Sequence, residues 1–175
     1  MRVEQGLTLL EMMVVLAIVA VVALAAIPAY DRLMARMESQ RVASEVNEAI
    51  RRAKIEAARN QKDTIVCLLD GSGGCHRLGD GGLMVFVDNN GNNRLDATDT
   101  VAMRQMWSLK YGTLSMSVSL SRDYIKFMGD NAKPRGHIGS IRYCSTMDTA
   151  LSHQLVLNMY GLVTLKRADI EQIAC

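Results

Sequence analysis

The chain has 175 residues, which is enough for one domain beyond a membrane segment. Its formal net charge of +2 is too small to indicate a nucleic-acid-binding protein by itself. The sequence contains no low-complexity segment, heptad array or internal repeat, which excludes coiled-coil and repeat architectures.

Residues 1–29 consist of a short polar leader, residues 1–6, followed by a long apolar segment. Arg2 and Glu4 lie in the leader, and residues 12–29 contain no charged side chain. An uncharged run of this length is typical of a membrane-spanning helix and is too long for the apolar region of an ordinary cleaved secretory signal. We therefore predict a transmembrane helix over residues 7–29 and a head over residues 30–175.

One ionisable residue, Glu11, lies at the start of the apolar run. A carboxylate in lipid is costly unless it meets a partner or a wet boundary. If the chain were cut after Gly6, the new amino group of Leu7 would lie about one helical turn from Glu11. We predict that this amine neutralises Glu11 on its own chain or on a neighbouring chain, which would set the register of assembled helices.

The N-terminal pattern is a short charged leader, then Gly6, an apolar Leu7, Thr8 and Glu11, and then the apolar helix. This pattern resembles the type IV prepilin family. The resemblance implies that a prepilin peptidase cuts between Gly6 and Leu7 and that Leu7 becomes N-methylated, although phenylalanine is commonest at that position. Pro28 lies where pilins commonly carry a helix-kinking proline. A plain uncleaved signal anchor is the alternative, because hydropathy alone does not exclude it.

The same resemblance implies a location and a set of partners. It predicts a single-pass inner-membrane protein with its head in the periplasm, which later enters a pilus or pseudopilus in the periplasm or outside the cell. The expected partners are other major and minor pilins or pseudopilins, the prepilin peptidase and the inner-membrane assembly platform.

After Pro28 the helical pattern continues to Asn60. One apolar stripe follows the helical period, and the opposite face mixes both charge signs, which favours packing on a sheet over lying on a membrane surface. Because Pro28 removes one backbone hydrogen bond, we expect a bend there rather than two helices. The stripe consists of Val42, Val46, Ala49, Ile50, Ala53 and Ala57.

Beyond Asn60 the sequence breaks into short apolar runs separated by Gly, Asn, Asp or Ser. Such runs indicate an antiparallel sheet, and strands that follow a single long helix indicate an α+β fold in which the helix covers one sheet face. The predicted strands cover residues 64–69, 83–88, 101–107, 114–119, 124–128, 138–143, 154–159 and 162–165.

Several segments of the head, residues 82–101, 125–129, 139–144 and 155–161, carry the motifs GLMVFVDNNGNNRLDATDTV, IKFMG, GSIRYC and LVLNMYG. With the N-terminal pattern, they resemble the GspH/FimT family of minor pilins and pseudopilins. The resemblance covers nearly the whole chain. It implies the type IV pilin fold and a structural subunit that needs no cofactor.

The four cysteines, Cys67, Cys75, Cys144 and Cys175, all lie beyond the membrane segment. An even number in an exported domain indicates two disulfides with three possible connectivities. We favour Cys67–Cys75, which closes a glycine-rich loop, and Cys144–Cys175, which fastens the end of the chain. A zinc site is the competing interpretation, but the spacings fit no paired zinc motif and His76 is poorly placed as a further ligand.

Residues 88–99 resemble a calcium-binding loop in their oxygen-rich side chains. An EF-hand loop has glycine at its sixth position and glutamate at its twelfth, whereas here Gly91 is fourth and Asp99 is last. A polar hairpin loop is the other interpretation, and we favour it, since Asn and Gly tolerate left-handed backbone angles. The candidate calcium ligands are Asp88, Asn90, Asn92, Asp96 and Asp99.

No catalytic arrangement can be recognised in the sequence. His76, His137 and His153 are scattered, and Ser140 lacks the surrounding glycines of a nucleophile elbow. The cysteines are better explained as disulfides of an oxidising compartment. We therefore predict a protein that is not an enzyme.

Clustered cations in the C-terminal half are candidates for DNA binding, at Lys133, Arg135, Lys166 and Arg167. The family that this chain resembles includes DNA-binding minor pilins of natural transformation. In those pilins a basic motif directly follows a glycine, whereas here four uncharged residues separate Gly161 from Lys166 and Arg167. Tyr143 and Tyr160 are predicted within or at the ends of strands, so no aromatic platform is expected. We expect weak or absent DNA binding.

Taken with the resemblance, these features favour a minor pilin that helps to prime type IV pilus assembly at or near the filament tip, with roles in twitching motility, adhesion or DNA uptake. The alternatives are a GspH-like pseudopilin of type II secretion and a DNA-binding pilin of natural transformation.

Overall fold

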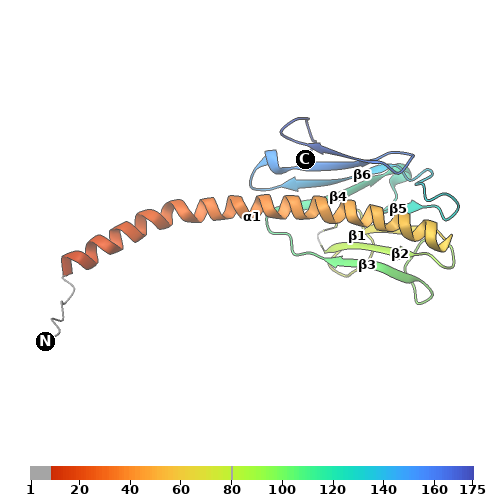
Figure 1. The fold of residues 1–175 in the computed structure, drawn as a ribbon, viewed down its shortest axis with the longest axis horizontal. Coiled ribbons are helices and arrows are strands. Elements are labelled where there is room, and N and C mark those ends of the chain that lie inside the picture. Colours follow the sequence, from red (N-terminus) through yellow and green to blue (C-terminus); the bar gives the residue numbers. More distant parts are fainter. Residues whose placement is uncertain (1–8, 80) are drawn as a thin grey trace. The chain divides into compact units, whose positions relative to one another are not determined.

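The computed structural model describes residues 9–79 and 81–175, apart from the side chain of Ala25. The chain divides into two compact units, residues 1–34 and residues 35–175. One helix, α1 (Leu9–Asn60), belongs to both units (Figure 1). It ends at Asn60, the residue at which the sequence pattern predicts its end.

In the first unit, the described side chains of α1 are exposed or only partly buried. This part of α1 is long and apolar enough to cross a membrane. Pro28 lies inside the helix, and α1 continues through it, as expected for a proline whose ring removes only one backbone hydrogen bond. The bend predicted at Pro28 remains a prediction.

In the second unit, the predicted stripe of α1 is buried. Val42, Val46, Ala49 and Ala53 are fully buried, and Ile50 is nearly so. Side chains spaced by three or four residues lie on one helix face, so this face forms a continuous apolar surface against the strands.

The strands form two four-stranded antiparallel sheets, whereas the sequence predicts antiparallel strands without dividing them between sheets. Sheet A has the order β3-β2-β1-β5, and sheet B has the order β4-β6-β7-β8. Short 3-10 helices cover Ser119–Ser121 and Thr149–Leu151. The strands are β1 (Thr64–Leu69), β2 (Gly82–Val87), β3 (Thr100–Met106), β4 (Gly112–Val118), β5 (Tyr124–Phe127), β6 (Gly139–Ser145), β7 (His153–Leu157) and β8 (Val163–Arg167).

All eight predicted strands exist, and no boundary differs by more than two residues from its prediction. One of the two-residue differences, at the end of β7, has a clear local cause. The prediction for β7 runs to residue 159, but the strand ends at Leu157. The side chain of Asn158 accepts hydrogen bonds from the backbone N–H groups of Tyr160 and Leu162, which turns the chain before the apolar residues 159 and 160. A side chain that bonds its own backbone competes with the strand ladder in this way.

The main core lies between α1 and one face of both sheets. Val66 and Val85 contribute to it from sheet A, and Ile141 and Leu155 contribute from sheet B. Sheet A is also buried on its other face, where Ile65, Cys67, Leu69, Met84 and Phe86 form a second cluster. The residues of β1 and β2 are therefore buried throughout, which explains why these two strands read as continuous apolar runs.

Candidate assembly and binding sites

Glu11, the predicted assembly residue, lies in the first turn of α1 as the structure describes it. The predicted cleavage position between Gly6 and Leu7 lies outside the described residues, and so does the proposed amine partner of Glu11.

Within the described residues, the large apolar side chains on either side of Glu11 belong to neither buried core cluster. Leu10, Met13, Leu16 and Ile18 are between 58% and 73% exposed. Each large aliphatic side chain removed from water stabilises the buried state by roughly 1.5–3 kcal/mol. This half of α1 therefore has a strong drive to enter lipid or to pack against neighbouring helices.

A second glutamate on α1, Glu38, is buried and was missed in the sequence. Its carboxylate accepts hydrogen bonds from the backbone N–H groups of Lys110 (2.9 Å) and Tyr111 (3.1 Å) and from the hydroxyl of Tyr143 (2.9 Å). Burial, together with the bond to Glu38, raises the pKa of Tyr143. The signal was present, because Glu38 precedes Val42 by four residues and so lies on the buried stripe.

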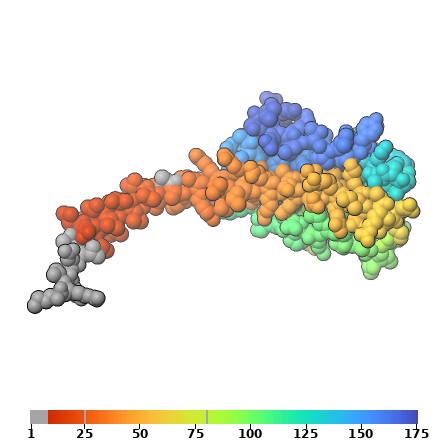
Figure 2. Space-filling model, viewed as in Figure 1, coloured from red at the N-terminus to blue at the C-terminus, as the bar shows by residue number. Residues whose placement is uncertain are grey.

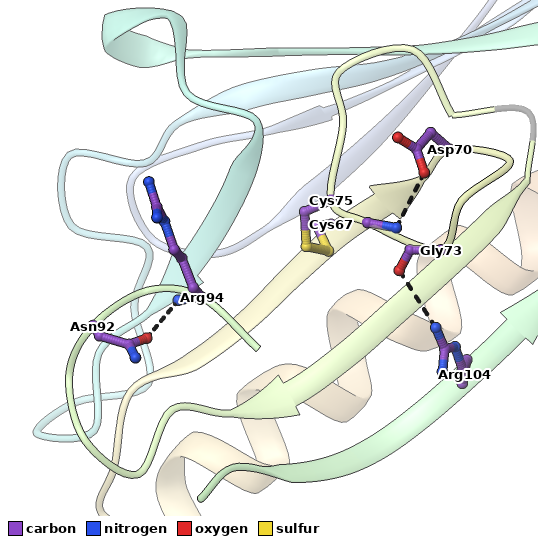
Figure 3. Close-up of a disulfide and its surroundings, with 8 residues drawn as sticks. Cys67, Asp70, Gly73, Cys75, Asn92, Arg94 and Arg104 are labelled. Carbon is purple, nitrogen blue, oxygen red and sulfur yellow. Dashed lines mark hydrogen bonds between the residues drawn. A yellow bond between two sulfur atoms is a disulfide. The ribbon is translucent and has the colours of Figure 1, made fainter. Parts of the chain in front are cut away.

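Both disulfides have the connectivity expected from the sequence, Cys67–Cys75 and Cys144–Cys175. Figure 3 shows the first pair, with Asp70 in the loop that it closes. Hydrogen bonds from Ser72 and from the backbone of Gly74 lower the pKa of Asp70 and fix this loop. Loop entropy assigns the bonds a stabilisation of about 2.5 and 3.7 kcal/mol respectively, because the second closes the longer segment.

The carboxylate of Asp88 holds the start of the candidate calcium loop. It is buried and accepts backbone hydrogen bonds from Gly91, Asn92 and Asn93 at 2.8–3.2 Å. Its oxygens are thus used by the loop's own backbone, as in an Asx-type turn.

Asp96 is held in a similar way at the other end of the loop. Its carboxylate accepts hydrogen bonds from the amide nitrogens of Asn90 (2.7 Å) and Asn92 (2.6 Å) and from Thr98. The hydrogen bonds from the side chain and backbone of Thr98 contribute most to lowering the pKa of Asp96 to about 2. Asp99 accepts from the backbone of Asn89. Within residues 9–79 and 81–175, no three His, Cys, Asp or Glu side chains are grouped for a metal. The polar-loop interpretation remains a prediction.

The four candidate DNA-binding cations lie at two separate places. Arg167 pairs with His153 at one end of the β7–β8 hairpin. The other end, where Leu157 pairs with Val163, leads into the turn at Gly161, and the loop that carries Lys133 and Arg135 packs against this turn through Pro134. The five-residue strand puts about 13 Å between the two ends. Arg135 pairs with Asp130 at 2.5 Å, and Lys166 pairs with Glu171 at 2.6 Å. These cations therefore do not form one phosphate-binding surface.

Tyr160, which was expected at the end of a strand, lies in the turn that follows β7. Its side chain is exposed, and the ammonium of Lys133 is 5.9 Å from its ring centroid. An exposed aromatic ring beside a cation is thus present, contrary to the expectation of no aromatic platform.

Two of the three histidines are buried. The Nδ1 atom of His153 lies 3.1 Å from the hydroxyl of Ser39, and its ring stacks on Tyr143. The Ser39 hydroxyl donates its proton to the carbonyl of Leu151 at 2.7 Å, so this serine is held as part of the core and is not activated by the imidazole. Burial lowers the pKa of His153.

Comparison with known proteins found both sequence and structural matches. Residues 1–27 match the prokaryotic N-terminal methylation motif, and residues 42–161 match the family described as type II transport protein GspH. No curated protein sequence matches the chain.

Two crystal structures of the type IV minor pilin FimU from Pseudomonas aeruginosa strain PAO1 are similar in fold. One is 14% identical, with a TM-score of 0.50, and covers 74% of this chain and 94% of its own. The other is 15% identical, with a TM-score of 0.52, and covers 77% of this chain and 92% of its own. At such identities the likeness concerns the fold alone.

Proposed function

Because this chain belongs to the family of type II transport protein GspH, we propose that it is a minor pilin, a structural subunit that helps to prime a type IV pilus at or near its tip. The observation that carries the proposal is the contrast within α1. One face of its C-terminal half is buried in the head, while its N-terminal half carries the methylation motif, Glu11 and the apolar residues 12–29, whose described side chains are exposed.

The proposed mechanism is lateral packing of the apolar helices in the membrane and then in the filament. A prepilin peptidase removes residues 1–6, and the methylated amine of Leu7 pairs with Glu11 on its own or a neighbouring chain. In an apolar environment, the amine and the carboxylate are both costly unless they meet. Packed helices therefore favour the axial alignment in which the two groups pair. The partners are other major and minor pilins and the inner-membrane platform, and the head lies in the periplasm.

Intact mass of the membrane-extracted protein tests the processing step. We expect a chain that begins at Leu7 and carries one methyl group. Gly6→Val should leave residues 1–6 attached, because a side chain at this position crowds the scissile bond. Met1 still present in protein from assembled filaments would contradict the proposal.

Incorporation into filaments tests the role of Glu11. Glu11→Ala should be processed normally but incorporated poorly, since the helix stays apolar while the register contact is lost. Glu48→Ala is the matched control, because Glu48 lies exposed on the same helix and forms a surface ion pair with Arg51 at 3.4 Å. Equal incorporation of both variants would contradict the register mechanism.

A pseudopilin of type II secretion is the second candidate, and the description of the matching family favours it. Deletion of the gene separates the two. Loss of surface pili with normal protein secretion supports the pilus subunit, and loss of secretion with normal pili supports the pseudopilin. A DNA-uptake role has less support, because the cations lie apart and two of them are paired with carboxylates.

A further inference from the structure

The turn between β7 and β8 holds three large side chains out of the head. Met159, Tyr160 and Leu162 are 60%, 62% and 60% exposed. The Asn158 side chain accepts from the backbone of Tyr160 and of Leu162 at 2.9 and 3.0 Å, and the Asn158 backbone exchanges hydrogen bonds with Gly161 and Leu162. The turn is therefore fixed before any partner arrives.

Further contacts fasten this turn to the rest of the head. Gly161 has a φ of +76°, which allows the tight turn, and its carbonyl accepts from the ammonium of Lys54 on α1 at 3.0 Å. A Cβ atom on Gly161 would lie 3.3 Å from Pro134, so the neighbouring loop packs closely against the turn. Figure 2 shows the cyan surface around residue 130 beside blue surface at the end of the yellow part of α1.

The exposed apolar surface continues from the turn across the end of sheet B. Leu120 is 81% exposed and Ile138 is 42% exposed, and Ser119 bonds the carbonyl of Ile138 through both its N–H and its hydroxyl. The register places Val118, Gly139, Leu157 and Val163 in neighbouring strands just inside these residues. We call the surface formed by Leu120, Ile138, Met159, Tyr160 and Leu162 the end face.

Leu120 is held in an unfavourable backbone conformation. Its φ is +61° and that of Ser121 is +56°, which are left-handed values that residues other than glycine adopt at a cost. Backbone strain of this kind is concentrated at binding and functional sites. Here the strained backbone exposes the aliphatic side chain of Leu120 to solvent, so this side chain does not stabilise the core.

Cations surround the end face without carboxylate partners. The guanidinium of Arg122 donates to the carbonyl of Gly136 at 2.8 Å, Lys54 donates to Gly161, and Lys133 lies over the Tyr160 ring. In the described part of the chain, none of these three cations forms an ion pair with an acidic side chain. Their contacts hold the charges in place but leave them unneutralised.

We propose that the end face docks into an apolar pocket with a carboxylate rim on a neighbouring filament subunit. The side chains of the end face are carried by an ordered turn, so the backbone of that turn loses little conformational entropy on binding. The cations around the end face favour a partner with carboxylates at the edge of its pocket. Leu120, Ile138, Met159 and Leu162 are aliphatic, so they gain more from a protein pocket than from a phosphate backbone. A symmetric pair of end faces is disfavoured, because their cationic rims would meet. Only the choice of a filament subunit as partner rests on the proposed function.

Site-specific photo-crosslinking of the full chain in the cells that produce it tests the proposal. Tyr160 is replaced by p-benzoylphenylalanine, which keeps an aromatic ring in the turn, and Leu78, which is 65% exposed but distant in sequence, is replaced in a matched control. We expect position 160 to give a crosslink to another pilin-fold subunit, mapped by mass spectrometry to a segment rich in Asp or Glu. The yield should be at least fivefold above that at position 78.

Charge reversal supplies the second arm. Arg122→Glu with Lys133→Glu should lower the crosslink yield at position 160 at least threefold, while normal processing and membrane levels show that the variant folds. Equal yields at positions 160 and 78, no effect of charge reversal, or crosslinks confined to nucleic acid or lipid would each overturn the inference. Absence of the wild-type chain from filaments would instead contradict the proposed function, so the two failures are distinguishable.

Discussion

The two halves of α1 contain similar residues in opposite circumstances. Ile18 is exposed in the first half, whereas Ile50 is buried in the second, although both lie in the same uninterrupted helix. Glu11 lies among exposed apolar residues, whereas Glu38 is buried and accepts three hydrogen bonds from the head. Composition alone therefore does not decide what a helical residue contacts.

The difference lies in the period of the apolar residues. From Val42 onward they recur every three or four positions and occupy one face, which one neighbouring surface can cover. Residues 12–29 are apolar all round, so no single sheet face can cover them, and only lipid or several helices can. The first half thus depends on partners outside the chain and the second half on partners inside it.

The contrast is tested most strongly by the isoleucine pair. Ile50→Ala should lower the free energy of unfolding of the head by about 2–5 kcal/mol, because it opens a cavity in the core. Ile18→Ala should leave the unfolding of the head unchanged. Urea titration of the full chain in detergent, followed by the fluorescence of the single Trp107, measures both. A comparable loss in the two variants would break the comparison.

The glutamate pair has a somewhat smaller effect. Glu38→Ala should cost about 2–3 kcal/mol of head stability, since it leaves two backbone N–H groups and the Tyr143 hydroxyl without their acceptor. Glu11→Ala should leave that stability unchanged and reduce only incorporation into filaments. A Tyr143→Phe variant in the Glu38→Ala background should add little further loss, because the bond is already gone.

A pH titration should affect the head through His137. Burial, with the charges of Arg122 and Lys126, lowers the pKa of His137 from 6.5 to about 4, against the opposing influence of Asp63. Between about pH 6.5 and pH 4, His137 is therefore protonated in the unfolded chain but neutral in the folded head. The free energy of unfolding of the head thus falls as the pH drops through this range, and the contribution of His137 levels off below about pH 4.

The loss due to His137 should be roughly 1–2 kcal/mol, less than the full shift implies, since the loop that covers it can adjust. His137→Phe, which keeps a ring beside Tyr124, should make the stability of the head less dependent on pH over that range. The comparison requires urea titrations of both proteins at pH 7 and pH 4.5. Identical pH dependence in both would show that other groups carry the effect.

The smallest expected effect is on DNA. At near-physiological salt, the full chain in detergent should bind duplex DNA weakly or not at all, because Lys166 and Arg135 are paired with acids and Lys133 lies at the other end of the hairpin from Arg167. Each phosphate contact contributes roughly −0.9 to the slope of log affinity against log salt. Micromolar binding that Lys166→Ala with Arg167→Ala abolishes, in a fluorescence titration, would contradict this expectation.

The fold was largely predictable because its elements are marked locally. The stripe from Val42 to Ala57 and the stop at Asn60 define the helix, and punctuated apolar runs define the strands. The division into two sheets was not predictable, since it depends on which distant strands pair, such as β1 with β5, and no local pattern specifies this pairing.

The candidate sites divide in the same way. The disulfide partners follow from loop closure, but the roles of Glu38 and Tyr160 depend on tertiary context. Glutamate is a residue type that usually lies on the exposed face of a helix. The burial of Glu38 is favourable because the backbone N–H groups of Lys110 and Tyr111 and the hydroxyl of Tyr143 donate hydrogen bonds to it. Tyr160 continues an apolar run, and only the bonds of Asn158 place it in a turn.

The order in which the strands join their sheets has a consequence for folding. The chain lays down β1, β2 and β3 in sheet A, passes to sheet B with β4, returns to sheet A with β5, and completes sheet B with β6 to β8. Sheet A thus lacks its last strand until after sheet B has begun, and neither sheet can mature as an independent folding unit. While the later strands are still missing, the early strands of sheet A have an unpaired edge, and unpaired edges are prone to aggregate. We expect such a head to fold in a single late cooperative step and to be most prone to aggregate before that step.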